Sequence, residues 1–200
     1  YTGEDTLSLH DALPIYEFLA NGFEEVEALA PVDILRRGGV EVKMVSITGS
    51  NLVESSHGVV VKADLLFENI TDFLDADLLM LPGGMPGSKN LNEHEGVRKA
   101  LKEQFEKGKR VAAICAAPLV LASVGLLKGK KATIYPGMES YLGEDAEYTG
   151  ALVQEDGNVT TGAGPAASFP YGYQLLSYFL PAEKVEEIKK GMIYDRLLNS

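Results

Sequence analysis

The chain has 200 residues, of which 46% are hydrophobic and 24% are charged. These fractions are typical of a globular protein with one sizeable core, and they exclude disordered and collagen-like classes. The formal net charge of -11 would repel nucleic-acid phosphates, so we expect no stable complex with nucleic acid.

The single cysteine, Cys115, cannot form an internal disulfide, and no apolar run is long enough to span a bilayer. A reducing cytoplasm is therefore the predicted location, without membrane contact. Residues 1–14 carry acidic side chains and lack the basic and long apolar regions of a signal peptide. We interpret them as an extension or an artefact outside the fold, and we predict a single domain over residues 15–200.

The predicted elements alternate between strands and helices from residue 15 onward. Short apolar runs indicate strands at residues 15–20, 40–47, 76–81, 110–114 and 132–135, with hairpins at 52–61 and 152–162. Apolar residues three to four apart indicate helices at residues 24–37, 92–107, 118–124, 165–179 and 182–198. Pro31 lies inside the first helix and is expected to kink it. The alternation predicts a mostly parallel sheet covered by helices on both faces.

Three segments follow predicted strands and contain small or acidic residues, namely residues 21–27, 82–84 and 114–118. In an open parallel sheet, ligands bind beyond the carboxyl ends of the strands, where loops and helix N-termini converge. We therefore expect these three segments to meet at one edge of the sheet.

Cys115 lies at a predicted strand-to-helix junction, in the stretch VAAICAAP of residues 111–118. Unpaired backbone N–H groups and the positive end of the helix dipole favour a thiolate at such a position. A sharp turn of this kind is typical of a nucleophile elbow, and the flanking alanines allow the backbone to pack closely. The alternative is a buried cysteine that serves only as a small apolar side chain.

Four stretches resemble the ThiJ/PfpI family, in particular its parkinsonism-associated deglycase branch and the small bacterial relatives of that branch. They are NGFEEVEALAPVDILRRGGVEV, LPGGMPGSKNL, AAICAAPLVLA and TGAGPAASFPYG, in the same order and spacing. The resemblance covers about residues 15–196. It implies a flavodoxin-like three-layer α/β sandwich with a mostly parallel sheet, similar to class I glutamine amidotransferases.

The resemblance also implies roles for individual residues. Cys115 would be the nucleophile, Glu27 would hydrogen-bond it, and the backbone N–H groups of Gly84 and Ala116 would bind an oxyanion. Without the resemblance, the acids of EEVE would be interpreted as first-turn residues that stabilise the helix dipole, and the glycine pair as an ordinary turn. Further residues expected to line the pocket are Gly83, Tyr135 and Pro165.

The resemblance implies a cofactor-free glyoxalase or deglycase that acts on glyoxal, methylglyoxal or their early protein adducts and releases a hydroxy acid. A cysteine beside a carboxyl group is consistent with that chemistry. We expect Glu27 to be protonated next to a Cys115 thiolate, so that the pair titrates as one unit. No cofactor or metal is expected, because phosphate-loop motifs and zinc-ligand spacing are absent from the sequence. The resemblance further implies a homodimer through the first helix.

Two other functions remain open from the sequence. One is an oxidative-stress sensor or holdase-like chaperone that uses oxidation of Cys115. The other is a peptidase or amidase of the wider family, although Ala116 stands where protease-like members carry histidine. Tyr135 likewise replaces a histidine of some deglycase members. The histidines lie outside the three converging segments, at His10, His57 and His94.

Overall fold

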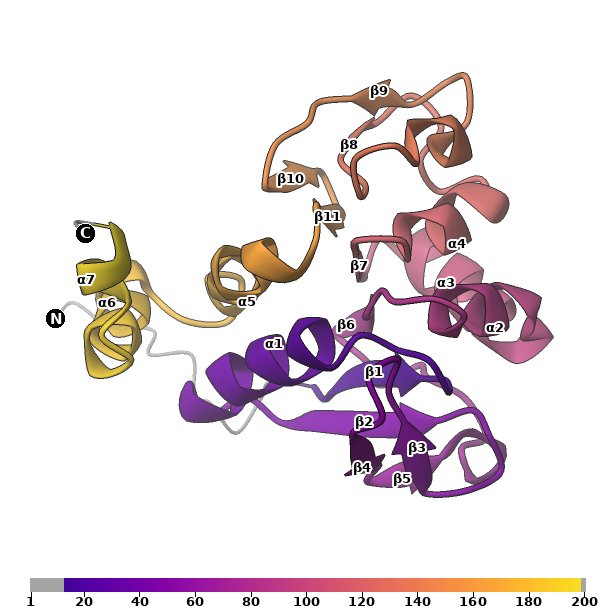
Figure 1. The fold of residues 1–200 in the computed structure, drawn as a ribbon, viewed down its shortest axis with the longest axis horizontal. Helices are drawn as coiled ribbons and strands as arrows, with labels where there is room; N and C mark the ends of the chain where they lie inside the picture. Colours follow the sequence, from indigo (N-terminus) through magenta and orange to yellow (C-terminus); the bar gives the residue numbers. More distant parts are fainter. Residues whose placement is uncertain (1–12, 199–200) are drawn as a thin grey trace, which may run out of the picture.

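Residues 13–198 are described by the computed structural model, in which helices cover both faces of a seven-stranded sheet (Figure 1). The strands are β1 (Ile15–Leu19), β2 (Val42–Ser46), β5 (Leu65–Leu66), β6 (Leu78–Leu81), β7 (Arg110–Ile114), β10 (Val153–Asp156) and β11 (Val159–Gly162). They are arranged in the order β10-β11-β7-β6-β1-β2-β5, and all neighbours are parallel except β10 and β11. The predicted fold class, a three-layer α/β sandwich with a mostly parallel sheet, is confirmed.

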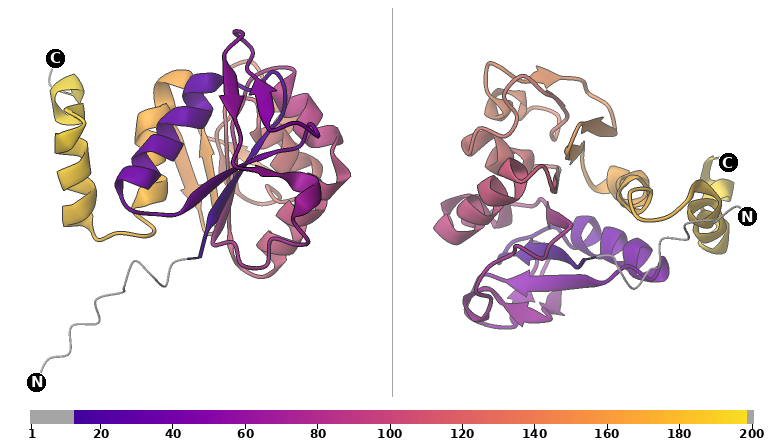
Figure 2. Two further views of the ribbon diagram at one scale, coloured as in Figure 1. Left: turned by 90° about the horizontal axis from the view of Figure 1, so that it is seen from below. Right: turned by 180° about the vertical axis from the view of Figure 1, so that it is seen from behind.

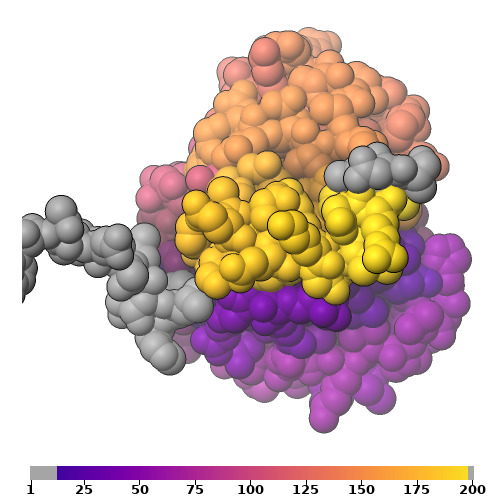
Figure 3. Space-filling model, turned by 90° about the vertical axis from the view of Figure 1, so that its left-hand side faces the viewer, coloured from indigo at the N-terminus to yellow at the C-terminus, as the bar shows by residue number. Residues whose placement is uncertain are grey.

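Two helical layers bury the two faces of the sheet (Figure 2). One layer contains α1 (Glu25–Arg37) and α5 (Ser168–Leu176), followed outside by α6 (Ala182–Gly191) and α7 (Tyr194–Leu198). The other contains α2 (Gly87–Glu93), α3 (Glu95–Glu106) and α4 (Pro118–Ser123). Figure 3 shows the yellow C-terminal helices against the indigo segment that contains α1.

The alternation of side chains in β1 explains why both layers are needed. Ile15 and Leu19 belong to the core under α1 and α5, whereas Tyr16 and Phe18 belong to the core under α2, α3 and α4. Successive residues of a strand point to opposite faces, so a strand that is apolar at nearly every position must be covered twice.

Smaller elements surround the main sheet. They are the antiparallel hairpin of β3 (Leu52–Glu54) and β4 (Val60–Lys62), the parallel pair of β8 (Lys131–Ala132) and β9 (Glu147–Tyr148), and the 3₁₀ helices η1 (Phe67–Asn69), η2 (Glu139–Leu142) and η3 (Pro165–Ala167). The hairpin is hydrogen-bonded to the start of α1, because Ser56 N donates to Phe23 O at 2.7 Å.

The helix predicted over residues 92–107 is present as α3, but its start differs, because residues 92 and 93 belong to α2. The division between the two helices falls at His94, whose Nδ1 accepts a hydrogen bond from Val97 N at 3.1 Å and caps α3. A side-chain cap of this kind ends one helix and starts the next without interrupting the apolar spacing, which is why the pattern concealed it.

Other boundaries also differ from the prediction. The helices expected at residues 165–179 and 182–198 are divided into η3 with α5 and into α6 with α7. The strand expected at residues 132–135 is reduced to β8. The first helix continues through Pro31 to Arg37, and the two residues of β5 were too few to show a pattern in the sequence.

The amino-terminal segment meets the fold just before β1. Leu13 N donates to Asp77 Oδ2 at 3.0 Å, and Pro14 O accepts from Asp77 N at 3.1 Å. Most of the predicted extension, residues 1–12, lies outside the described residues, so the predicted domain limits stay a prediction. Within residues 13–198, none of the helices has the length and apolar composition that crossing a bilayer requires.

Candidate active site

The three segments that follow β1, β6 and β7 meet at the carboxyl edge of the sheet. Glu24 N donates to Gly83 O at 2.9 Å, and Gly83 N donates in return to Glu27 Oε2 at 3.0 Å. Gly87 N donates to Gly22 O at 3.1 Å. Because β1, β6 and β7 are adjacent strands, these hydrogen bonds join the loops into one site at the edge where the strand connections change direction.

Cys115 occupies a tight turn directly after β7. Its φ is 61°, a left-handed conformation that costs a residue other than glycine about 1–2 kcal/mol. Cys115 N donates to Gly162 O at 2.8 Å and Ala117 N donates to Ile114 O at 3.0 Å, which fixes the turn between β7 and α4. The strained conformation and these hydrogen bonds make the turn a nucleophile elbow in geometry.

Gly83 packs between the cysteine and the acid of the site. A Cβ atom at this position would lie 2.5 Å from Cys115 Cβ and 2.8 Å from Ile114 O, and it would also overlap Glu27 Oε2. Only glycine therefore allows these three residues to approach one another. The sequence predicted Gly83 as a pocket residue, and the structure gives it this close-packing role.

Glu27 lies in the first turn of α1 and points inward. Its backbone N–H is capped by Glu24 Oε2 at 2.7 Å, and its side chain is 1% exposed. Oε1 accepts no hydrogen bond from any residue in the range 13–198. Burial raises the pKa of Glu27 to about 7, against the opposing effects of hydrogen bonds with the Cys115 thiol and with Gly83 N–H. Such a carboxyl can exchange a proton near neutral pH.

The electrostatics of Cys115 differ from the sequence-based expectation of a resting thiolate. Burial and the neighbouring Glu27 carboxylate raise the pKa of Cys115 to about 12 and outweigh the N–H groups of Gly84 and Ala116, which act to lower it. The helix that follows has only 6 residues, so its dipole offers little compensation. Of the two groups, the Glu27 carboxyl therefore ionises first as pH rises, and it can then accept the proton of the Cys115 thiol.

Two backbone N–H groups act on the sulfur. Those of Gly84 and Ala116 hydrogen-bond Cys115 and favour negative charge beside it. Gly84 has a φ of 88°, and a Cβ there would lie 2.7 Å from Gly22 O. Glycine is thus required at position 84 both for the backbone conformation and for the contact with the loop after β1.

The model of the DJ-1/PfpI family matches residues 14–178 of this sequence. The chain belongs to the DJ-1/PfpI family. It is 35% identical to the Parkinson disease protein 7 homolog of Danio rerio over 177 residues, which cover 88% of this chain and 94% of that protein. It is 39% identical to a deglycase of Pyrococcus horikoshii over 149 residues, 74% of this chain and 87% of that protein.

Solved structures of the DJ-1/PfpI family agree with this fold. Drosophila melanogaster DJ-1beta has a TM-score of 0.87 at 33% identity, covering 91% of this chain and 98% of that chain. The oxidized form of Toxoplasma gondii DJ-1 has a TM-score of 0.86 at 32% identity, with the same coverage. The predicted membership of the ThiJ/PfpI deglycase branch is therefore confirmed.

Of the two other predicted pocket residues, Tyr135 is hydrogen-bonded to the Cys115 turn of this DJ-1/PfpI protein. Tyr135 N donates to Cys115 O at 2.9 Å, and the Tyr135 side chain is 47% exposed. Its ring lies over Gly164, where an added Cβ would be 3.3 Å from Tyr135 Cδ2. Pro165 follows at the exposed start of η3. Tyr135 thus contacts the Cys115 turn through its backbone and Gly164 through its ring.

The histidines in the described residues lie away from the sulfur, whereas His10 falls outside them. His94 caps α3 and packs against Phe67 with ring centroids 4.6 Å apart. His57 Nδ1 pairs with Glu25 Oε1 at 3.0 Å. The ligand atoms of Glu24, Glu25 and His57 lie within 4.8 Å of one another, a grouping that sequence reasoning missed because the β3–β4 hairpin brings His57 to α1. The Glu24 cap and the Glu25 ion pair account for this grouping within the chain.

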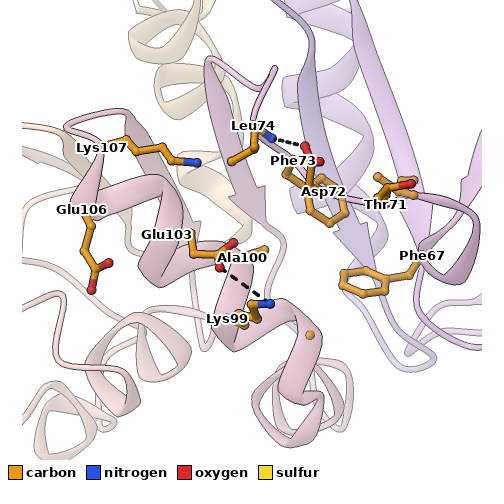
Figure 4. A pocket seen from close by; sticks show the side chains of 12 residues that line it. Phe67, Thr71, Asp72, Phe73, Leu74, Lys99, Ala100, Glu103, Glu106 and Lys107 are labelled. Carbon is orange, nitrogen blue, oxygen red and sulfur yellow. Dashed lines mark hydrogen bonds and ion pairs between the residues drawn. The ribbon is translucent and has the colours of Figure 1, made fainter.

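A second hollow lies between α3 and residues 67–74, as Figure 4 shows. Its volume is about 520 Å³, and no residue of the Cys115 site lines it. The floor contains Phe67 and Phe73, while Lys99 on the rim pairs with Glu103 at 3.7 Å. Because the lining carries charges of both signs, with Lys99 and Lys107 beside Asp72, Glu103 and Glu106, the hollow has no concentrated positive charge that would select a phosphate or nucleotide.

Proposed function

We propose that this DJ-1/PfpI protein is a cofactor-free glyoxalase or deglycase in which Cys115 is the nucleophile and Glu27 the general base. The observation that carries the proposal is a buried carboxyl, with its pKa raised to about 7, against a buried thiol that two backbone N–H groups also face. Substrates would be glyoxal, methylglyoxal or their early adducts on protein side chains. The similarity to named deglycases supports the same class of reaction.

The first step forms a bond between sulfur and the aldehyde carbon. As Cys115 attacks, its proton passes to the Glu27 carboxylate, and the carbonyl oxygen becomes an oxyanion. That oxyanion would be stabilised by the N–H groups of Gly84 and Ala116, which already favour negative charge at this position. The product of the step is a hemithioacetal, and no net charge is created or lost.

The second step moves protons within the adduct. Glu27 first gives the proton that it took from the sulfur to the oxyanion, and so becomes a carboxylate again. It then removes the hydrogen from the former aldehyde carbon and returns a proton to the adjacent carbon through an enediol. The aldehyde carbon is thereby oxidised to a thioester while the neighbouring carbonyl is reduced to an alcohol, so no external oxidant is required. Water then cleaves the thioester, regenerates the thiol and releases a hydroxy acid.

A substrate panel tests the proposal directly. Wild-type protein and Cys115→Ala are incubated with free methylglyoxal and, separately, with preformed early adducts of lysine, arginine and cysteine. We expect lactate from wild type and none above background from Cys115→Ala. Lactate production by a folded Cys115→Ala protein would overturn the proposal. Release from preformed adducts faster than their spontaneous decay identifies a deglycase, and turnover of free aldehyde alone identifies a glyoxalase.

A redox sensor is less well supported by this site. Cys115 is 8% exposed and its pKa is raised, and both properties slow reaction of the sulfur with peroxide. Two added oxygens on Cys115 at low peroxide, found by intact mass measurement, would favour the sensor. A peptidase is disfavoured because the group beside the sulfur is Glu27 and not an imidazole.

We also propose a homodimer and a cytoplasmic location. Exposed apolar residues on α1 and on the hairpin joined to its start support a second copy as partner, and they are Val26, Leu29, Leu52 and Val60. Light scattering of Leu29→Lys against wild type tests the dimer, and an unchanged mass of one chain for both proteins would contradict it. The single cysteine supports a reducing compartment.

A further inference from the structure

Tyr171 lies closer to the proposed nucleophile than its place in α5 would suggest. It is 1% exposed and heads the largest fully buried side chains of the described residues. A Cβ added to Gly162 would lie 3.2 Å from Tyr171 Cδ2 and 2.8 Å from Ile114 Cγ1. Gly162 also holds the nucleophile in place, because its carbonyl accepts the hydrogen bond from Cys115 N at 2.8 Å. The Tyr171 ring is therefore packed against the end of β11, where Gly162 pairs with Ile114 of β7.

The hydroxyl of Tyr171 and one oxygen of Glu27 are both without partners. Tyr171 Oη and Glu27 Oε1 are buried and make no hydrogen bond within residues 13–198. The helices that carry them are in close contact, since a Cβ on Gly172 would lie 3.1 Å from Pro31 Cα and 2.7 Å from Ile34 Cδ1. The negative charge of Glu27 also acts on the phenol of Tyr171. Buried polar atoms are rarely left unsatisfied, so this pair of atoms calls for a function.

Glu17 is the second polar group near Tyr171. It occupies the middle of β1 on the same face as Ile15 and Leu19, which belong to the core under α1 and α5. Its side chain is 1% exposed, and Oε2 has no hydrogen-bond partner in the described range. Burial raises the pKa of Glu17 well above its ordinary value, with Arg36 acting in the opposite direction. Glu17 is accordingly a neutral carboxylic acid that can donate a hydrogen bond.

We propose that Tyr171 is a positioning residue of the Cys115 site, whose hydroxyl donates to Glu27 Oε1 when Glu27 is ionised and accepts from Glu17 on its other side. The proposal rests on the proposed role of Glu27 as the base. In this arrangement the hydrogen bonds from Glu17 to Tyr171 and from Tyr171 to Glu27 stabilise the Glu27 carboxylate, which must exist before the sulfur attacks. Each of the two hydrogen bonds strengthens the other. No proton leaves Tyr171 during the reaction.

The charged and titratable groups around these residues come from several elements. Tyr171 is faced by Glu17 of β1, Glu27 of α1 and Tyr178 after α5. Glu27 is faced by Cys115 and Glu24. Tyr178 and Glu24, which take no part in the proposed hydrogen bonds, already have partners. Tyr178 Oη hydrogen-bonds Thr160 Oγ1 at 2.7 Å, and Glu24 caps α1. Within residues 13–198, the acidic oxygens near Tyr171 that lack a partner are thus Glu27 Oε1 and Glu17 Oε2, which belong to the two acids of the proposal.

Carbon NMR titration of the glutamate side-chain carboxyls tests the proposal without any substrate. The Glu27 signal is assigned by its loss in Glu27→Gln. In Tyr171→Phe, which removes only the hydroxyl, we expect the Glu27 midpoint to rise by about one pH unit, because a hydrogen bond to the carboxylate is lost. The control is Tyr173→Phe in the same helix, whose hydroxyl points to Met192 Sδ at 3.3 Å, and it should leave the midpoint in place.

Glu17 provides an independent pair of variants. Glu17→Leu removes the donor to Tyr171 and should raise the Glu27 midpoint by a smaller amount, whereas Glu17→Gln keeps an N–H donor and should restore it. A purely structural role would change thermal stability and leave the midpoint unmoved. An unchanged Glu27 midpoint in Tyr171→Phe, or equal midpoints in Glu17→Leu and Glu17→Gln, would overturn the proposal. Failure of the proposed function would appear instead as absence of lactate from a wild-type protein with normal titration.

Discussion

The carboxyl edge of the sheet and its middle each contain a buried glutamate, and the two sites differ in what surrounds the acid. Glu27 and Glu17 are both 1% exposed. Glu27 has a thiol and a backbone N–H beside it, and burial raises its pKa only to about 7. Glu17 has core side chains and a more distant Arg36, and its pKa is raised well above the ordinary value. Equal burial thus yields a proton acceptor at one site and an acid that favours its protonated form at the other.

The difference follows from position in the sheet. At the carboxyl edge, loops present unpaired N–H groups that can stabilise negative charge. In the middle of β1, every N–H is committed to the ladders with β2 and β6, which pair Glu17 with Met44 and Met80. A carboxyl group whose pKa lies near neutral pH therefore requires both burial and nearby hydrogen-bond donors. The carboxyl edge of the sheet supplies both.

The largest effect is expected from Glu27→Gln. Removing the base should lower kcat/KM for methylglyoxal by about 10²–10⁴-fold. In wild type, kcat/KM should rise as pH increases through about 7, because Glu27 loses its proton there, and this rise should be absent from the variant. Loss of the carboxylate should also lower the pKa of Cys115, so alkylation by iodoacetamide should begin at lower pH than in wild type.

Glu25→Gln is the matched control for that variant. Glu25 lies in the same first turn of α1, but it pairs with His57 at the surface. We expect its kcat/KM to remain within about threefold of wild type, as for a surface substitution. Equal losses in Glu25→Gln and Glu27→Gln would show that negative charge at this helix end matters and that the buried position of residue 27 does not.

Gly83→Ala should damage the edge site through packing. The added methyl group would overlap Glu27, Cys115 and Ile114, so we expect a loss of about 1–3 kcal/mol in the free energy of unfolding together with loss of turnover. Gly191→Ala at the end of α6 meets no atom within 4 Å and should be neutral or slightly stabilising. Denaturant unfolding of both variants measures the difference, and a stable, active Gly83→Ala protein would contradict the described contacts.

Glu17→Met should stabilise the protein. At neutral pH the unfolded chain ionises residue 17 while the folded protein keeps it protonated, so wild-type stability falls as pH rises above about 4.3. Methionine removes this effect and the unsatisfied oxygen, and it matches Met44 and Met80 on the neighbouring strands. We expect a gain of about 1–3 kcal/mol at pH 7 by urea unfolding, larger at pH 8 than at pH 5. A loss of stability at every pH would mean that the hydrogen bond proposed from Glu17 to Tyr171 outweighs the cost of burying this acid.

The smallest effect is expected from His57→Asn. The hydrogen bond and charge of Glu25 raise the pKa of His57, so the ion pair is present below that pKa and is lost as pH rises through it. The His57 side chain is 68% exposed, and exposed pairs contribute little. We expect a small drop in thermal midpoint at pH 5.5 and none at pH 8.5. A larger drop at pH 8.5 would point to packing of the ring and not to its charge.

The pattern of the sequence was sufficient to predict the sheet and the place of its functional edge. β1 and β7 are buried apolar runs followed by glycine or alanine, and these short-range signals survive in the structure. The resemblance, not the pattern, supplied the pairing of Cys115 with Glu27, because that pairing joins residues far apart in the chain. Its geometry depends on Gly83 N, which lies 56 positions from Glu27.

The protonation of the site could not be predicted from sequence. Proximity to a helix start suggested a thiolate, but the balance depends on how deeply sulfur is buried and on how near the Glu27 carboxylate lies. Glu17 was passed over for the same reason, since it stands inside an apolar strand without a motif. The protonation of Cys115 and of Glu17 depends on burial by residues that are far away in the chain. Neither residue type nor spacing indicates this burial.

The hydrogen bond from Cys115 N to Gly162 O has a consequence for biosynthesis. β11 is translated well after β7, so for several seconds at ~5–20 residues per second a nascent chain carries the sulfur without its final cover. During that interval the turn at Cys115 lacks the hydrogen bond that fixes its backbone in the folded protein. The left-handed conformation of Cys115 is therefore expected to form only once β11 has paired with β7.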